Sequence, residues 1–137
     1  MFDKTEKAGR RPLDGVRVLD FSRVLAGPYC TAMMADLGAE VIKVEPPTGD
    51  DYRHIGPFKG GESLLFQSVN RGKKSIVLDL KSAEGAATAR ALAAQSDVLI
   101  ENFRPGVMQR FGLGPQELCA ACPELVYISV SGFGQTG

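Results

Sequence analysis

The sequence predicts an α/β fold, an open parallel sheet of about five strands with flanking helices. The first observation is that five short runs rich in Val, Ile and Leu recur along the 137 residues. The second is that the segments between these runs are long enough to hold helices. Alternating strand and helix patterns are typical of βαβ units, whose crossover connections make neighbouring strands parallel. The length and the hydrophobic content of 44% fit one domain with a substantial core.

The predicted strands cover residues 16–21, 40–44, 75–80, 97–101 and 125–130. Their nearly continuous apolar composition is typical of strands that are buried on both faces of a sheet. After the last run the sequence offers only SGFGQTG, which is too short to supply a covering helix. We therefore expect this sequence to be the N-terminal part of a longer protein, or a partner to supply the missing layer.

The first predicted helix has well-marked ends. Pro28 suits a first helical position, and Gly38 suits a left-handed stop after the last turn. The apolar stripe of this helix consists of Tyr29, Met33 and Leu37, with Cys30 and Met34 beside it.

Three further helical segments follow along the chain. Ser82 is the predicted N-cap of an alanine-rich helix, and Glu84 in its first turn suits the helix dipole. A short helical turn is expected after Pro105, ending near Gly112, and another helix is expected over residues 115–121.

Two segments lack regular patterns. Residues 45–74 are rich in Pro and Gly and predict an irregular excursion, with one helix within GESLLFQSVN; long excursions of this kind are usually functional or interfacial. Residues 1–11 predict a polar N-terminal tail, which leaves 12–137 as the folded region.

The composition limits the classes of function. Sixteen basic and sixteen acidic residues cancel, so the overall charge does not predict binding to nucleic acid or to an anionic membrane. There is no apolar run of signal-peptide or membrane-span length, and we expect a cytoplasmic protein. Cys119 and Cys122 form a CxxC late in a predicted helix, where packing is a better explanation than redox or zinc chemistry, and we expect no metal site. The single histidine, His54, is expected to be structural or solvent-exposed.

The candidate site lies at the carboxyl ends of the strands, where open α/β sheets bind their ligands. The stretch ENFRPG follows the fourth strand, and the loops SRVLAGP, EPP, LDLK and SGFGQTG follow the others. These ends carry Arg23, Lys81, Arg104 and, one turn further on, Arg110, together with an aromatic ring at Phe103. Cations beside a ring predict a phosphorylated nucleotide as the ligand.

Each of these residues also has a structural explanation. Arg104 could be a solvated surface charge, Phe103 could cap the sheet, and Asn102 could form the turn before Pro105.

The usual nucleotide motifs are absent. A dinucleotide-binding loop would place GxGxxG after the first strand, but SRVLAGP has only Gly27. Glu45, at the end of the second strand, could fill the acidic position of such a fold. The run Gly72-Lys73-Lys74-Ser75 lacks the earlier glycine of a P-loop and leads into a strand.

Four blocks of the sequence resemble the family III coenzyme A transferases, which include formyl-CoA, carnitine and succinyl-CoA:glutarate CoA-transferases. The blocks are PLDGVRVLDFSRVLAGPYCTAMMADLGAEVIKVE, VNRGKKSIVLDLKS, DVLIENFRPGVMQRFGLG and ISVSGFGQTG. They follow one another in order from Pro12 to Gly137, over nearly the whole chain.

The resemblance implies a Rossmann-like domain that binds CoA or acyl-CoA, a small carboxylic acid as the second substrate, and a homodimer of interlocked subunits. Some relatives carry a basic residue directly after the glutamate of the second strand, whereas this chain has Pro46. The CoA contacts implied by the motifs are Leu25, Ala26, Leu78, Asp79, Leu80, Lys81, Asn102, Phe103, Arg104, Arg110, Ser131, Gly132, Phe133 and Gly134.

In this family an aspartate attacks the acyl-CoA thioester, and an aspartyl-CoA thioester then passes CoA to the acceptor carboxylate. The matching motif lies beyond SGFGQTG, so no aspartate of this chain is assigned as the nucleophile, and the isolated chain is expected to be inactive. Two alternatives remain open. One is a 2-methylacyl-CoA racemase of the same superfamily, and the other is a non-catalytic nucleotide-binding module, for example for NAD.

Overall fold

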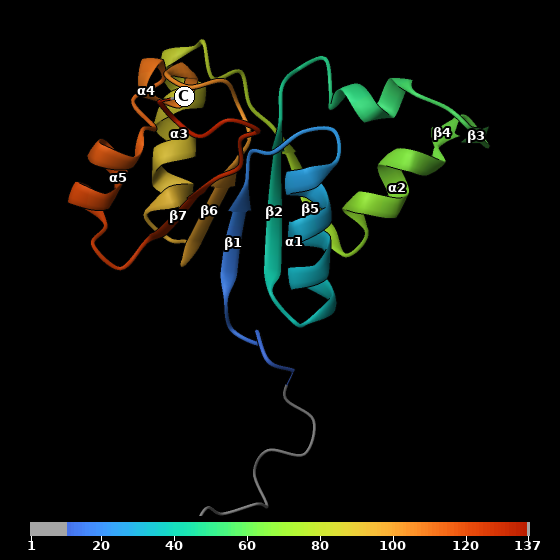
Figure 1. Cartoon of the computed structure of the whole chain (residues 1–137), viewed down its shortest axis with the longest axis horizontal. Helices are drawn as coiled ribbons and strands as arrows, with labels where there is room; N and C mark the ends of the chain where they lie inside the picture. The colour runs from blue at the N-terminus through green and yellow to red at the C-terminus, as the bar shows by residue number, and fades with distance from the viewer. Residues whose placement is uncertain (1–10, 137) are drawn as a thin grey trace, which may run out of the picture.

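The computed structural model describes residues 11–136 and has a five-stranded parallel sheet in the order β5-β2-β1-β6-β7 (Figure 1). The strands are β1 (Arg17–Asp20), β2 (Glu40–Glu45), β5 (Lys73–Val77), β6 (Val98–Glu101) and β7 (Val126–Ser129). The α/β class and the parallel sheet predicted from the sequence are therefore confirmed. The predicted tail lies outside the described residues, except for Arg11.

Five helices accompany the sheet in the described part of the chain: α1 (Ala26–Asp36), α2 (Leu64–Asn70), α3 (Ala83–Ala93), α4 (Val107–Arg110) and α5 (Pro115–Ala121). The excursion after β2 contains a 3-10 turn, η1 (Asp51–His54), and a small antiparallel hairpin, β3 (Phe58–Lys59) and β4 (Glu62–Ser63). The helix expected in GESLLFQSVN is α2, whereas the hairpin has no counterpart in the prediction.

The strand order reverses between β1 and β6. From β1 the chain moves outward through β2 to β5, and then returns to place β6 on the other side of β1, followed by β7. Between the carboxyl ends of β1 and β6 lies the switch point at which such sheets leave a crevice.

Each face of the sheet has its own apolar core. On one face α1 packs over residues that include Val18, Val41 and Ile100. On the other, α3, α4 and α5 supply Ala89, Met108 and Leu118 to the core beside Leu19 and Leu99. The central strands are thus buried on both sides, which explains their continuous apolar sequences.

The face of α1 that packs on the sheet is not the apolar stripe expected from the sequence. Gly27, Pro28, Thr31 and Ala32 are the residues buried in α1, because small side chains allow the helix backbone to approach the sheet closely. The stripe of Tyr29, Met33 and Leu37 is instead 42% to 49% exposed. Pro28 is the third residue of the helix rather than the first, and Gly38 ends it with a φ of 111°, as predicted.

The third predicted strand is shifted toward the N-terminus. β5 begins at Lys73, which pairs with Val41 of β2, and ends at Val77. Leu78 still donates its N–H to the Glu45 carbonyl at 2.9 Å, after which the chain leaves the sheet. Residues 78–80, predicted as strand, therefore belong to the loop at the carboxyl edge.

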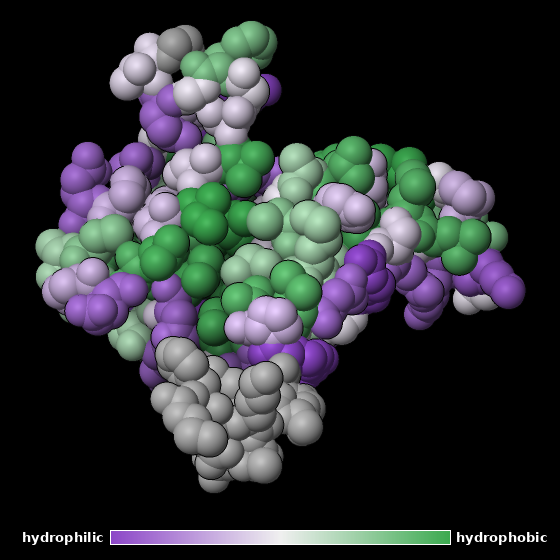
Figure 2. Space-filling model, turned by 60° about the horizontal axis from the view of Figure 1, so that its bottom comes forward, coloured by the Kyte–Doolittle hydropathy of each residue, from purple (hydrophilic) through white to green (hydrophobic). Residues whose placement is uncertain are grey.

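Apolar surface is also exposed away from α1. The arm that carries α2 and the β3–β4 hairpin projects from the sheet (Figure 1), and Figure 2 shows hydrophobic surface on it, where Ile55, Phe58 and Leu64 are exposed. Val126 of the edge strand β7 is also exposed. Within residues 11–136 no helix is long and apolar enough to cross a membrane.

Candidate functional site

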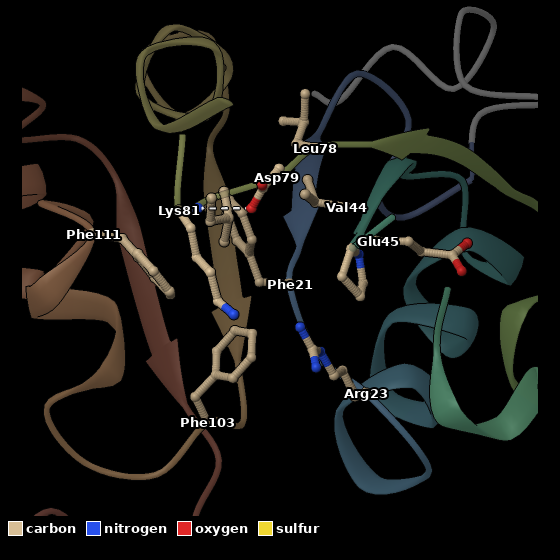
Figure 3. Close-up of a pocket in the computed structure, with 11 residues that line it drawn as sticks. Phe21, Arg23, Val44, Glu45, Leu78, Asp79, Lys81, Phe103 and Phe111 are labelled. Carbon is tan, nitrogen blue, oxygen red and sulfur yellow. Dashed lines mark hydrogen bonds between the residues drawn. The ribbon is translucent and has the colours of Figure 1, made fainter. Parts of the chain in front are cut away.

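Two adjoining pockets lie at the carboxyl edge of the sheet. The first is formed by the ends of β1, β2 and β5 together with two aromatic rings of the facing loops (Figure 3), and its lining residues are Phe21, Arg23, Val44, Glu45, Pro46, Leu78, Asp79, Leu80, Lys81, Phe103 and Phe111. The second lies over the ends of β6 and β7, and its lining residues are Ala26, Asn102, Phe103, Arg104, Pro105, Val130, Ser131, Gly132, Phe133 and Gly134. Phe103 lines both pockets, so the two adjoin at its ring.

The structure brings most of the sequence-predicted residues together in these pockets. Ala26, residues 78–81, residues 102–104 and residues 131–134 all line them. Arg110 lines a depression beside the first pocket, and Leu80, Lys81 and Phe111 line both of them. Leu25 lines none of these pockets; it is the N-cap residue of α1 and is 51% exposed.

Asn102 joins the two loops at the switch point. Its Oδ1 accepts a hydrogen bond from the Arg23 N–H at 2.8 Å, and its Nδ2 donates to the Arg23 carbonyl at 2.8 Å. The amide predicted to contact a ligand is therefore already used by the neighbouring loop. Gly27 allows the start of α1 to approach the loop after β1 closely, because a Cβ on it would lie 2.3 Å from the Ser22 Cβ.

The cationic side chains meet an aromatic face. The Arg23 guanidinium carbon lies 4.8 Å from the centroid of the Phe103 ring, within the range of a cation–π contact. Figure 3 shows Lys81 extending from the β5 end toward the same ring. Arg104 follows Phe103 and is exposed at the second pocket. The edge thus combines a flat apolar surface with three positive charges.

The loop after β5 is fixed against the start of α3. The Ser82 hydroxyl caps the helix by accepting from the Gly85 N–H at 2.9 Å, as predicted, and it donates to the Asp79 carbonyl at 2.8 Å. Asp79 Oδ1 in turn accepts from the Lys81 N–H at 3.0 Å. Gly85 has no room for a side chain, because a Cβ would lie 2.0 Å from the Asp79 carbonyl oxygen.

A buried polar network supports the loop after β1. The Asp20 carboxylate accepts from Thr31 at 2.6 Å and from Lys73 Nζ at 3.0 Å. Beside it, Lys43 Nζ and Asp50 Oδ2 form an ion pair at 2.8 Å, with each side chain only 1% exposed. Burial lowers the pKa of Lys73 to about 8, while the attraction of Asp20 limits the decrease.

Glu45 turns its carboxylate away from the first pocket (Figure 3). Its oxygens accept hydrogen bonds from Arg53 Nε at 2.6 Å, from Arg53 Nη2 at 2.7 Å and from Ser75 Oγ at 2.6 Å. Burial alone would raise the pKa of Glu45, but these hydrogen bonds lower it to about 2. The carboxylate considered for a dinucleotide-type role is thus engaged inside the protein.

Comparison with known proteins decides the family. The family profile described as "CoA-transferase family III" matches residues 13–137. This chain belongs to the family III CoA-transferases. An acetyl-CoA:oxalate CoA-transferase of Acetobacter aceti is 50% identical over all of this chain and 36% of its own length. The human succinyl-CoA:glutarate CoA-transferase is 50% identical over 93% of this chain and 30% of its own length.

Solved structures agree with the family assignment. A CAIB/BAIF family protein from Brucella suis has a TM-score of 0.89 and 45% identity, covering 93% of this chain and 35% of that one. A hypothetical protein from Mycobacterium tuberculosis has a TM-score of 0.87 and 44% identity, covering the same shares of the two chains. The chain therefore spans about a third of the length of the relatives that it matches.

In this family III chain, the aspartates that the structure describes at or near the site are already engaged. Asp20 and Asp50 are buried and ion-paired, and Asp79 accepts from the loop backbone. Among residues 11–136, no cluster of three or more His, Cys, Asp or Glu side chains is arranged to hold a metal. Cys119 and Cys122 are free thiols and half-buried rather than fully buried, and His54 is exposed, as expected.

Sequence reasoning missed several residues of the site. Phe21 and Phe111 line the first pocket, and Lys43 and Asp50 hold the loop after β1 through the Ser22 carbonyl and the Val24 N–H. The signal for Lys43 was a cation in the middle of a predicted buried strand, where an unpaired charge is costly and a partner must be close. That partner comes from the irregular excursion, which no periodicity could have indicated.

Proposed function

We propose that this chain is the CoA-binding part of a CoA-transferase that moves CoA from an acyl-CoA donor to a small carboxylic acid. The observation that supports this most is the convergence of the family's motif loops on two adjoining pockets, where Phe103 lies beside positive charges that form no ion pair within residues 11–136. A ring and a set of cations suit the adenine and the phosphates of CoA. The proposed contacts are those implied by the motifs, with Asn102 acting through the loop that it holds.

The proposal is tested by calorimetric titration of the 137-residue chain with CoA and with NAD. We expect CoA to bind more tightly, and the Arg104→Ala variant to bind CoA about tenfold more weakly, as for loss of one charged hydrogen bond. Arg71→Ala is the matched control, because Arg71 pairs with Asp36 at the end of α1 away from the site. Tighter binding of NAD, or no binding of CoA, contradicts the proposal.

The transfer step is proposed to use an aspartate that is not among the residues of this chain. The aspartates at the site support this, since the buried ones are ion-paired. We expect the chain alone to bind CoA without transferring it between an acyl-CoA and a dicarboxylate. Measurable transfer would show that a nucleophile lies within residues 1–137. A NAD-binding module is disfavoured because Gly27, the one glycine of the first loop, packs against Ser22 and leaves no glycine-rich turn.

We also propose that the protein acts as a homodimer, as the resemblance implies. Exposed apolar side chains on α1 and on the α2 arm support this, because contiguous apolar surface usually marks a contact. Light scattering across a range of concentrations measures the assembly. A stable monomer at all concentrations would count against a dimer.

A further inference from the structure

We propose that Arg23, which the family motifs do not mark as a CoA contact in this chain, is a phosphate-binding residue held in position before the ligand arrives. This inference rests on the proposed function, because the phosphate would belong to CoA. It is carried by an arginine at the pocket wall whose guanidinium has no hydrogen-bond or ion-pair partner among residues 11–136 and whose backbone is held on both sides.

The Arg23 guanidinium makes no hydrogen bond or ion pair within the described part of the chain, and its Nε is buried without an acceptor. A buried donor without an acceptor is costly, so such groups generally have a partner in the functional state. The neighbouring carboxylates are engaged elsewhere. Glu45 is held by Arg53, and Asp50 pairs with Lys43. Glu101 accepts from the Phe103 N–H at 2.8 Å, and Asp79, which lines the same pocket as Arg23, accepts from the Lys81 N–H at 3.0 Å.

The backbone on both sides of Arg23 is fixed by buried groups. Lys43 Nζ donates to the Ser22 carbonyl at 2.8 Å, and Asp50 Oδ1 accepts from the Val24 N–H at 3.2 Å. Between them, the Asn102 amide binds both the N–H and the carbonyl of Arg23. Val24 has a φ of 67°, which is strained for a β-branched residue and persists only where the surroundings enforce it. Contacts within the protein therefore fix the backbone of this loop.

The chemistry around the guanidinium favours a phosphate. Arg23 and Lys81 reach the Phe103 ring from the loops after β1 and β5 (Figure 3), and both line the same pocket. Two like charges facing one cavity repel each other, and an anion bound between them would offset this repulsion by attracting both. The planar fork of arginine matches the oxygens of a phosphate, and its stacking on a ring fixes the plane of that fork.

The test uses calorimetric titration of wild type, Arg23→Ala and Arg23→Lys with three ligands: CoA, 3′-dephospho-CoA and adenosine. We expect Arg23→Ala to weaken CoA binding about tenfold or more, and Arg23→Lys to weaken it less, because lysine keeps the charge and loses the fork. Adenosine, which has no phosphate, should bind the variants as it binds wild type. A loss that disappears with 3′-dephospho-CoA assigns Arg23 to the 3′-phosphate, and a loss that remains assigns it to the pyrophosphate.

Folding is checked by circular dichroism and thermal melting. Both substitutions leave in place the backbone groups that Asn102 binds, and Arg23→Lys also retains the cation near the ring. If wild type binds CoA and Arg23→Ala binds it equally well, the inference is wrong and the proposed function stands. An equal loss for adenosine shows a structural role and also overturns it. If wild type does not bind CoA, both the inference and the proposed function fail.

Discussion

Acid should destabilise this fold through Glu45, the last residue of β2. Its side chain is 2% exposed and its folded-state pKa is lowered from 4.5 to about 2. Because the unfolded chain binds a proton on this group more readily than the folded chain, the free energy of unfolding must decrease as the pH falls below about 4.5. The contribution is fully present above that pH and is lost as the pH approaches 2.

The magnitude follows from the shift in pKa. A decrease of that size corresponds to about 3 kcal/mol at neutral pH. The partner Arg53 is 41% exposed, so solvent screens part of the attraction. We therefore expect Glu45 to contribute about 2 kcal/mol at pH 7, with more than half of it lost by pH 3.

Urea denaturation of wild type and Glu45→Gln between pH 7 and pH 3, followed by circular dichroism, measures this contribution. The two proteins should differ by about 2 kcal/mol at pH 7 and converge as the pH decreases. The matched control is Glu40→Gln, at the other end of β2, where the ion pairs with Arg17 and Lys74 are exposed and worth little. A difference between wild type and Glu45→Gln that stays constant with pH would refute the reasoning.

Three other predictions concern the supports of the site. Gly27→Ala should destabilise the chain by roughly 1–3 kcal/mol and weaken CoA binding, because its Cβ would lie 2.3 Å from the Ser22 Cβ. The stability is measured by chemical denaturation, with Gly132→Ala as the control because no atom lies within 4 Å of its Cβ. Equal losses of stability in the two variants would contradict the steric explanation. Gly85→Ala should displace the 78–81 loop from α3. Hydrogen exchange would reveal this as lost protection of the Lys81 and Ser82 amides. Unchanged exchange would show that the loop does not depend on this contact. Between pH about 8 and 10.5, Lys73 binds a proton more weakly in the folded than in the unfolded state. The free energy of unfolding of wild type should therefore rise with pH over this range when it is compared with that of Lys73→Met. A relative decrease would mean that the attraction of Asp20 outweighs the effect of burial on the pKa of Lys73.

The strands and most helix ends could be predicted from the sequence because their signals are local. Continuous apolar runs gave β1, β2, β6 and β7 to within one or two residues, and Ser82 and Gly38 act as the predicted cap and stop. The place of the ligand edge followed from the parallel topology, which depends only on the alternation of elements.

The orientation of α1 could not be predicted in this way. An apolar stripe normally faces the core, yet here the smaller residues, including Gly27 and Ala32, face the sheet and the larger ones are exposed. Which face packs depends on how closely the helix must approach the strands, and on what covers its outer surface. Neither quantity is encoded in the periodicity of the helix itself.

The role of Asn102 was out of reach for a related reason. Its partner, the Arg23 backbone, is 79 positions away in the sequence. The spacing of ENFRPG places an amide at the right edge of the sheet, but a ligand and a neighbouring loop offer that amide the same donors and acceptors. Only the position of the first loop decides between them.

The buried charges explain how one conformation of that loop is selected. Burying an ion pair such as Lys43–Asp50 generally contributes little net stability, because the loss of hydration offsets the attraction. The pair nevertheless binds the carbonyl of Ser22 and the N–H of Val24, two groups that would otherwise be satisfied by water in many loop conformations. An arrangement that broke these bonds would leave a buried charge or a buried peptide group without a partner, and this penalty opposes relaxation of the strained backbone at Val24. The irregular excursion that supplies Asp50 therefore determines the geometry of the loop next to the proposed phosphate site.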